Sequence, residues 1–140
     1  MGRELNILIA GSRKFDSYIE LSVVMDNLIN TYKSIGGFSK FNIVSGGALG
    51  ADTLAERYAK DRNLEMVIFP ADWEKHGKSA GFIRNEQMHK YIASKSHRAV
   101  VCFWSSEERS KGTSHNFDLC IKYNNPLFIW DFYSKKFIQN

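Results

Sequence analysis

The sequence has few cysteines, no long apolar run and no metal-binding pattern among its four histidines. Its two cysteines, Cys102 and Cys120, lie in apolar stretches without metal-like spacing, so we interpret them as reduced core residues, as is usual in the cytosol. No apolar run approaches the ~20 residues that span a bilayer, and Met1 to Glu4 does not resemble the start of a signal peptide. We therefore expect a cytoplasmic protein without a membrane segment, a metal or a cofactor.

The composition is that of an ordinary globular domain. The chain has 140 residues, of which 44% are hydrophobic and 24% charged, and it shows no internal repeat, linker or low-complexity segment. This length fits a single domain, residues 1–140, with a proper core. The net charge is +4 and the Lys and Arg residues are scattered. Such a charge favours anionic ligands weakly and is poor support for nucleic-acid binding.

Apolar strand-like runs alternate with amphipathic stretches along the whole chain. Strands are expected at residues 5–10, 41–44, 65–69, 98–104 and 127–130, and residues 136–138 form either a short final strand or a tail. Helices are expected at 17–33, 53–61, 82–93 and 113–123, and a long polar loop at 71–81. This alternation predicts an α/β fold, a three-layer sandwich with a mostly parallel sheet covered by helices on both faces.

Every polar or glycine-rich cluster follows a predicted strand. The clusters are residues 11–13, 46–52, 72–86 and 109–113, and the beginnings of the strands carry nothing comparable. In open parallel sheets, ligands bind outside the carboxyl ends of the strands. We therefore predict that the four clusters line one site.

The second cluster combines a strand, a glycine-rich turn and a helix start. Its glycines, Gly46, Gly47 and Gly50, allow a tight turn and leave room for a ligand at a helix N-terminus, where phosphate is a natural guest. The spacing is not the dinucleotide fingerprint G-x-G-x-x-G, because two glycines are adjacent. A plain strand-to-helix turn capped by Asp52 is the alternative interpretation.

Several segments together resemble a known family. They are residues 9–15, 45–52, 69–73 and 77–88, with a later match at 110–115. They are similar to the YspA-type branch of the SLOG superfamily, and the resemblance covers nearly the whole chain. It implies a Rossmann-like fold related to the cytokinin-activating nucleotide phosphoribohydrolases and to a DNA-processing protein that loads single strands. It also implies a nucleotide or nucleotide-derived ligand, and some branches cleave the N-glycosidic bond.

The chain departs from the phosphoribohydrolases at their catalytic motif. They carry Pro-Gly-Gly-x-Gly-Thr followed by a helical Glu, whereas this chain has Ser45 before its glycine pair and then reaches Asp52. Gly112 and Thr113 also lack a preceding Gly-Gly. The catalytic assignment of those enzymes therefore does not transfer directly.

The candidate ligand-binding residues come from all four clusters. Arg13 and Arg84 suit phosphate because a guanidinium offers a planar set of donors. Asn85 suits a base edge, and Trp73 either stacks on a base or fills the core beneath its loop. The full set is Gly11, Ser12, Arg13, Ser45, Gly46, Gly47, Gly50, Asp52, Asp72, Trp73, Arg84, Asn85, Gly112 and Thr113.

Asp52 and Glu86 are the candidate catalytic carboxylates. Asp52 in a first helical turn would repel an adjacent phosphate, so it fits a ribose hydroxyl or the role of general base. Glu86 is its rival. Arg84, Asn85 and Glu86 are consecutive on a helix and point about 100° apart, so they cannot all face one ligand.

Three functions are compatible with the sequence. The first is a sensor or sequestering protein for a nucleotide-derived small molecule, and the second is an N-glycosidic hydrolase of nucleoside monophosphates. Single-stranded nucleic-acid binding is third, because it needs an extended basic groove with several aromatic platforms. Homo-oligomerisation, which is frequent among relatives, is left open.

Overall fold

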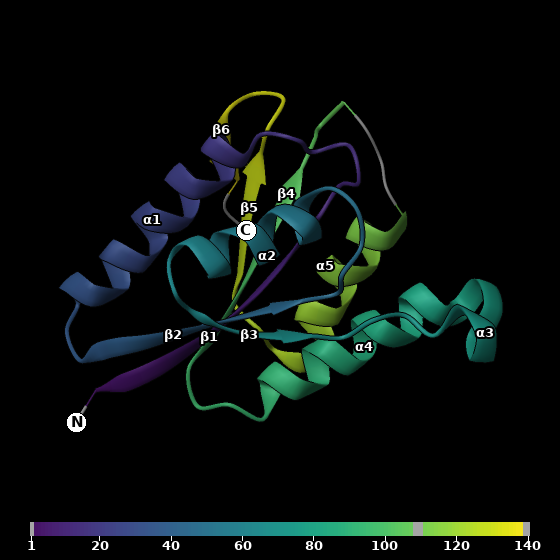
Figure 1. The fold of residues 1–140 in the computed structure, drawn as a ribbon, viewed down its shortest axis with the longest axis horizontal. Coiled ribbons are helices and arrows are strands. Elements are labelled where there is room, and N and C mark those ends of the chain that lie inside the picture. Colours follow the sequence, from purple (N-terminus) through teal and green to yellow (C-terminus); the bar gives the residue numbers. More distant parts are fainter. Residues whose placement is uncertain (1, 108–110, 139–140) are drawn as a thin grey trace.

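The computed structural model describes residues 2–107 and 111–138. Its described residues form one six-stranded sheet in the order β3-β2-β1-β4-β5-β6, in which β6 alone is antiparallel (Figure 1). The order of the strands is that of the doubly wound Rossmann sheet. The strands are β1 (Arg3–Gly11), β2 (Phe38–Ser45), β3 (Glu65–Ile68), β4 (Arg98–Trp104), β5 (Leu127–Asp131) and β6 (Lys136–Ile138).

Helices cover both faces of the sheet. One core contains Ile7, Ile9 and Ile43 beneath α1 (Tyr18–Ser34) and α2 (Ala51–Asp61). The other contains Leu8 and Val44 beneath α4 (Ala80–Ala93) and α5 (Lys111–Tyr123). Successive strand residues point to opposite faces, so continuous apolar runs such as that of β1 supply both cores. The predicted three-layer α/β sandwich is thus confirmed.

Both cysteines lie in the core. Cys102 and Cys120 are both free and buried, and burial raises the pKa of Cys120 to about 12, which keeps its thiol protonated. Within the described part of the chain, no helix combines the length and the apolarity that crossing a membrane requires.

The predicted loop at residues 71–81 is helical instead. It forms α3 (Trp73–His76) and a 3-10 turn, η1 (Gly77–Ser79), and α4 then begins at Ala80 rather than at Phe82. The Asp72 carboxylate starts α3 by accepting a hydrogen bond from the Lys75 amide at 3.1 Å. The stretch lacks an apolar stripe, so periodicity could not reveal it.

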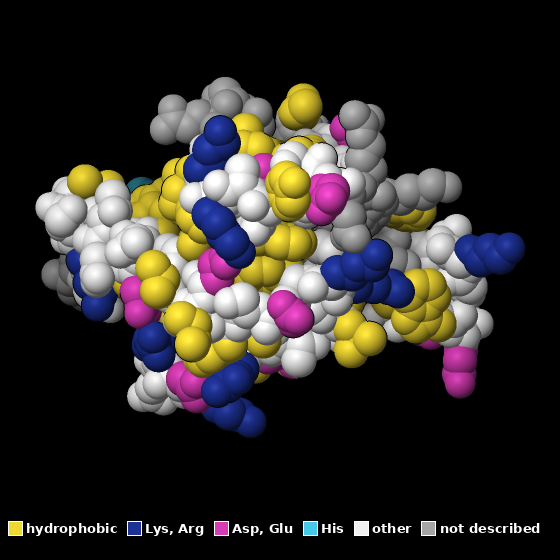
Figure 2. All heavy atoms as spheres, turned by 90° about the horizontal axis from the view of Figure 1, so that it is seen from above, with side chains coloured by type: hydrophobic (Ala, Val, Ile, Leu, Met, Phe, Trp, Pro, Cys, Tyr) yellow, Lys and Arg dark blue, Asp and Glu magenta, His cyan; other side chains and the backbone are white. Residues whose placement is uncertain are grey.

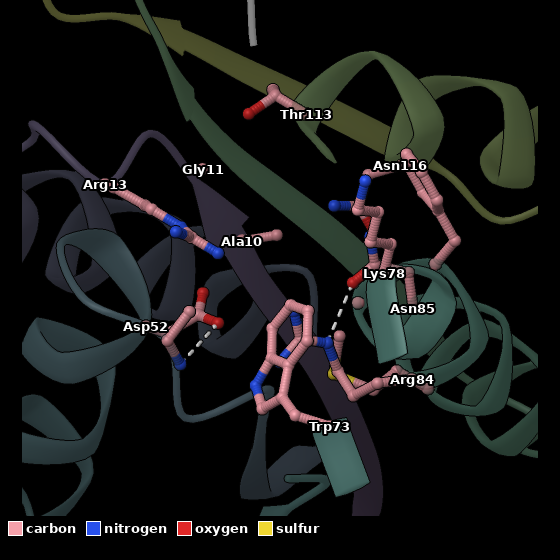
Figure 3. A pocket seen from close by; sticks show the side chains of 14 residues that line it. Ala10, Gly11, Arg13, Asp52, Trp73, Lys78, Arg84, Asn85, Thr113 and Asn116 are labelled. Atoms are coloured by element: carbon pink, nitrogen blue, oxygen red, sulfur yellow. Dashed lines mark hydrogen bonds between the residues drawn. The ribbon is translucent and has the colours of Figure 1, made fainter. Parts of the chain in front are cut away.

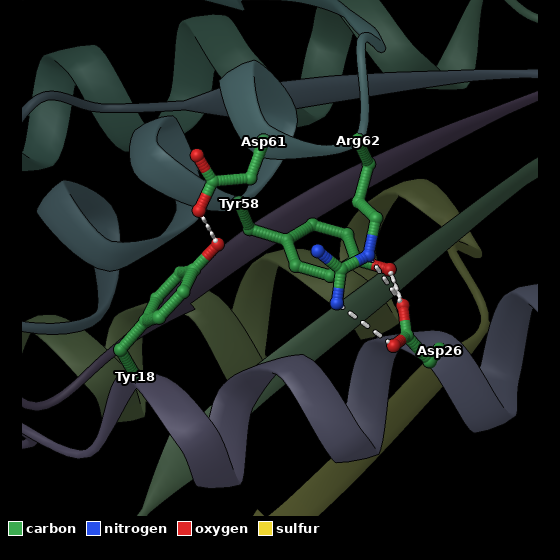
Figure 4. A network of polar contacts seen from close by, with 5 residues as sticks. All are labelled: Tyr18, Asp26, Tyr58, Asp61 and Arg62. Carbon is green, nitrogen blue, oxygen red and sulfur yellow. Dashed lines mark hydrogen bonds and ion pairs between the residues drawn. The ribbon is translucent and has the colours of Figure 1, made fainter.

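A polar network fixes α2 against α1 (Figure 4). Arg62 donates two hydrogen bonds to Asp26, of 3.1 and 2.9 Å, and the Tyr58 hydroxyl donates a third. Tyr18 at the start of α1 donates to Asp61 at the end of α2. Hydrogen bonding by Arg62 and Tyr58 lowers the pKa of Asp26. These contacts hold α2 in place and hence position the residues at its N-terminus.

Candidate functional site

A cavity of about 180 Å³ lies at the carboxyl ends of the central strands (Figure 3). Residues from β1, the turn after β2, the α3–η1 segment, α4 and α5 surround it. The lining residues are Ala10, Gly11, Arg13, Ala48, Asp52, Trp73, Lys78, Gly81, Phe82, Arg84, Asn85, Met88, Thr113 and Asn116. In Figure 3, Arg13 and Asp52 lie across the cavity from Asn85 and Asn116.

A second hollow of about 430 Å³ adjoins the first. The two share Arg13, Ala48, Trp73 and Arg84, and five further residues line the second hollow alone. These are Gly46, Gly47, Leu49, Pro70 and Ala71. The structure thus brings residues of all four sequence clusters to one region, with Thr113 representing the last.

Asp52 is a buried carboxylate in the wall of the cavity. It is the second residue of α2, only 6% exposed, and its Oδ2 accepts a hydrogen bond from the Ala48 amide at 3.2 Å. Burial raises the pKa of Asp52 to about 6, against the opposing effects of the Ala48 hydrogen bond and of the Arg84 charge. Asp52 therefore keeps its proton to a higher pH than an ordinary aspartate, and its hydrogen bond with Ala48 holds the glycine-rich turn to the start of α2.

Arg84 is a buried cation in the lining of the cavity. It is 8% exposed, and its Nη1 donates to the Gly46 carbonyl at 2.5 Å. A Cβ at Gly46 would lie 2.7 Å from this nitrogen, so only glycine leaves space for the guanidinium. Burial lowers the pKa of Arg84 while the Asp52 charge raises it. The Gly46–Arg84 contact ties the turn after β2 to α4.

The cavity is rich in hydrogen-bond donors. Among the described residues, its lining includes three cationic side chains, Arg13, Lys78 and Arg84, and a single carboxylate, Asp52. Arg84 Nε donates to Asn85 Oδ1 at 3.0 Å, and the amide nitrogen of Asn85 lies 3.5 Å from His115 Nδ1. This balance suits an anionic, oxygen-rich ligand.

Comparisons with known proteins place the chain in a family. The sequence profile of the YspA, cpYpsA-related SLOG family matches residues 5–76. Gene 61 protein of Mycobacterium phage D29 is 36% identical over 115 residues, which are 78% of this chain and 82% of that protein. The chain belongs to the YspA, cpYpsA-related SLOG family.

One solved structure with a distant likeness to this SLOG protein is described as a predicted subunit of tRNA methyltransferase from Methanocaldococcus jannaschii. It is 15% identical, with a TM-score of 0.39 over 89% of this chain and 65% of that one. The family profile ends at His76, so the contributions of α4 and α5 to the cavity rest on the geometry of this chain alone.

Three residues that we expected to touch a ligand instead make hydrogen bonds within the loops around the SLOG cavity. Ser45 Oγ donates to the Asp52 carbonyl at 3.2 Å, and Ser12 Oγ accepts from the Lys14 amide at 3.1 Å. Asp72 caps α3. None of these three side chains is among the described residues that line either hollow. They shape the loops that carry the lining residues.

Gly50 also differs from the expectation of open space at the helix start. A Cβ there would lie 2.3 Å from the Ser12 carbonyl oxygen, which already accepts a hydrogen bond from the Ala51 amide at 3.3 Å. Gly50 has a φ of 82°, a conformation that other residues rarely adopt. The N-terminus of α2 is therefore closed by the loop after β1, and Gly50 serves their close approach.

Glu86 lies away from the cavity. Its carboxylate accepts hydrogen bonds from Lys122 Nζ at 2.5 Å and from Tyr123 Oη at 2.6 Å, and these two partners lower its pKa. The angular spacing along α4 explains this: Arg84 and Asn85 face the cavity, whereas Glu86 faces α5. Asp52 is thus the carboxylate that the described lining provides.

Two polar lining residues were missed by sequence reasoning. Asn116 lies one helical turn after Thr113, so the i, i+3 spacing on one helix face could have predicted that both side chains line the cavity. Lys78 reaches the cavity from η1, a turn that was predicted as loop. Of the last cluster, Gly112 lies in α5, and Arg109 and Ser110 fall outside the described residues. No group of three or more His, Cys, Asp or Glu in the described chain is placed to hold a metal.

Proposed function

We propose that the protein binds a nucleotide or nucleotide-derived small molecule, as a sensor or sequestering protein. The observation that carries this proposal is the convergence of Arg13, Lys78 and Arg84 on a cavity to which the described part of the chain contributes one carboxylate, Asp52. Membership of the SLOG family points to nucleotide-related binding or processing and adds support. A phosphate is the group that such a set of donors fits best.

The arrangement suggests a role for each wall. Phosphate oxygens would accept from Arg13 and Lys78, both exposed at the mouth, and from the inner Arg84. Asp52 would accept from a sugar hydroxyl. Trp73, which is 54% exposed, offers an aromatic face for a base. All of these groups lie on one cavity, as a phosphate–sugar–base ligand requires.

The test is calorimetric titration with a panel of nucleoside monophosphates, combined with native mass spectrometry of small molecules carried through purification. We expect Arg13→Ala to weaken binding by about 1.5–3 kcal/mol, the range for a charge-assisted hydrogen bond. Arg13 is exposed and outside the core, so the melting temperature should not change.

Lys40→Ala is the matched control, because it removes an exposed cation near the amino end of β2, whereas the cavity lies at the carboxyl ends of the strands. It should bind like the wild type. If Arg13→Ala and the wild type bound the nucleotide with equal affinity, Arg13 would not be a phosphate-binding residue. Absence of binding by any nucleotide, with none carried through purification, would refute the proposed function.

The raised pKa of Asp52 favours a second candidate, N-glycosidic hydrolysis of a nucleoside monophosphate. An ionised Asp52 would take a proton from water as the oxygen bonds to the anomeric carbon and the bond to the base breaks, the electron pair leaving with the base. Its charge would also stabilise the developing sugar cation. Wild type would then release free base, whereas Asp52→Asn would bind the nucleotide and leave it intact. Recovery of intact nucleotide from the wild type would establish a receptor instead.

A further inference from the structure

The first cavity and the second hollow share one wall. Arg13, Ala48, Trp73 and Arg84 line both, so these residues form the boundary between them. The first cavity measures about 180 Å³, which is less than the roughly 300–1,000 Å³ of most small-molecule sites. The second hollow measures about 430 Å³. A nucleotide-sized ligand that reaches Asp52 in the first cavity must therefore extend across the boundary into the second hollow.

Two arginines at this boundary have unused donors. Arg13 forms no hydrogen bond or ion pair with another residue that the structure describes. Arg84 donates from Nη1 to Gly46 and from Nε to Asn85, and its Nη2 has no partner among the described residues. Burial lowers the pKa of Arg84, Asp52 raises it and the charge of Arg13 lowers it again, so the two guanidiniums lie close enough to repel each other. An anion between them would relieve this repulsion and accept from the unused donors.

The charge of the lining indicates the charge of that anion. Among the described residues, the two hollows are lined by three cations, Arg13, Lys78 and Arg84, and by one carboxylate, Asp52. The lining therefore carries a net charge of about +2 when Asp52 is ionised. A diphosphate that is esterified at both ends carries about one negative charge on each phosphoryl group, and so matches this charge, because the second ionisation of a phosphate monoester is lost. A single phosphodiester would leave one of the cations uncompensated.

The second hollow is uncharged beyond the boundary. The described residues that line it alone have apolar side chains or none. They are Gly46, Gly47, Leu49, Pro70 and Ala71. A terminal phosphate that pointed into this part of the hollow would lose hydration without gaining a cation. A neutral group fits there instead, so the phosphoryl groups at Arg13 and Arg84 lie within the ligand and not at its end.

We propose that the site takes a nucleoside diphosphate conjugate, with its ribose beside Asp52, its diphosphate between Arg13 and Arg84, and a second sugar or nucleoside in the second hollow. This inference rests on the proposed function and names the class of ligand. Trp73, which lines both hollows and is 54% exposed, stacks against a ring of the ligand at the boundary. A nucleoside monophosphate fills only part of this site and binds more weakly.

The first experiment is calorimetric titration with a series of ligands of increasing length. For each RNA base, the series contains the nucleoside monophosphate, the nucleoside diphosphate and the symmetrical dinucleoside diphosphate. We expect the dinucleoside diphosphate of the preferred base to bind at least about tenfold more tightly than either shorter ligand, a difference of about 1.4 kcal/mol. The nucleoside diphosphate is the control for charge, because it adds a phosphoryl group without a second nucleoside. Equal or tighter binding of a shorter ligand would overturn the proposal.

The second experiment fills the second hollow with a side chain. Ala71 is half-buried and lines only this hollow, so Ala71→Phe occupies it and changes no residue of the first cavity. The variant should bind the dinucleoside diphosphate at least about tenfold more weakly and the monophosphate within about twofold of wild type. Ala93→Phe makes the same change at a half-buried position outside both hollows, at the end of α4, and should bind every ligand like wild type.

Leu49→Trp covers the case in which Ala71→Phe does not fold. Leu49 also lines only the second hollow and is 73% exposed, so the fold tolerates a larger side chain there, and the same selective loss is expected. Wild-type affinity of a folded variant for the dinucleoside diphosphate would overturn the proposal.

The outcomes separate this inference from the proposed function. If the monophosphate binds and a longer ligand gains nothing, the proposed function stands and the diphosphate conjugate is excluded. If no member of the series binds, both fail.

Discussion

The residue that most shapes the site is Asp52. Burial raises its pKa to about 6 because the ionised carboxylate loses hydration that the Ala48 amide and Arg84 only partly replace. The folded protein therefore carries an unfavourable charge at neutral pH. Unfavourable buried charges of this kind concentrate at functional sites, where stability is sacrificed for chemistry or recognition.

Asp52→Asn should stabilise the protein at neutral pH. The folded state holds a proton on Asp52 up to about pH 6, whereas the unfolded state releases it near pH 4, so wild-type stability falls as the pH rises through this window. The side-chain amide of the Asp52→Asn variant cannot ionise, so the variant does not lose stability over this pH range. We expect a gain of about 2–3 kcal/mol at pH 7 that vanishes below about pH 4. Urea unfolding across this range measures it, and a variant no more stable than wild type at pH 7 would contradict the assignment.

Gly46→Ala tests the tie between the glycine-rich turn and α4. The new methyl group would lie 2.7 Å from Arg84 Nη1 and 2.8 Å from its Cδ, so the guanidinium must move. We expect a loss of about 1–3 kcal/mol in stability, together with weaker nucleotide binding.

Gly81→Ala, in the lining of the first cavity and also next to Arg84, is the matched control. Its methyl group would meet Trp73 and Arg84 at 3.7 and 3.8 Å, which is ordinary contact, and alanine favours the helix. This variant should be as stable as wild type or slightly more so in thermal unfolding. Equal behaviour of the two variants would show that Arg84 does not need the space at Gly46.

At the scale of elements, α3 and η1 differ from the rest of the fold. Neither contains a buried residue, yet they supply Trp73 and Lys78 to the cavity. In Figure 1, α3 lies at the end of the molecule, beyond the sheet. A segment with so little burial gains little from packing, so its opening free energy is small.

Residues 73–79 should therefore exchange their amide hydrogens faster than the second half of α4, which carries the buried His89 and Ile92. A bound nucleotide that contacts Trp73 should slow this exchange selectively. Hydrogen-exchange mass spectrometry with and without nucleoside monophosphate measures both effects. Exchange that is unchanged at saturating nucleotide would show that this segment takes no part in binding.

At the scale of the whole molecule, charge is distributed rather than gathered. On the face in Figure 2, the basic and acidic side chains of the described residues are interspersed. The net charge is only +4. Single-strand binding proteins use a basic groove with repeated aromatic platforms, whereas the cavity of this chain is compact and is lined by Arg13, Lys78 and Arg84.

An oligonucleotide should therefore bind no more tightly than a nucleoside monophosphate. Fluorescence anisotropy with a labelled single strand, run at low and moderate salt, makes the comparison, with competition by the mononucleotide as the control. Affinity that rises with strand length and falls steeply with salt would instead favour single-stranded nucleic-acid binding as the function.

The match between prediction and structure follows the strength of the local signal. The predicted strand at residues 98–104 coincides with β4, because its apolar run is continuous and bounded by polar residues. The weak signal at 136–138 is a real strand, β6, but only pairing with β5 stabilises so short a segment. The gathering of the clusters followed from a general property of parallel sheets, whereas the separation of Glu86 from the cavity depended on the rotation of α4.

The sequence by itself determined the layers, the parallel sheet, the family resemblance and the edge where a ligand would bind, because periodicity and strand ends are local properties of the chain. Only the tertiary structure decided which side chains meet there. Gly46 makes room for Arg84, Gly50 for the loop after β1, and Asn116 lies within hydrogen-bond distance of His89 on another helix. Such contacts depend on the packing of distant segments, which no local pattern encodes.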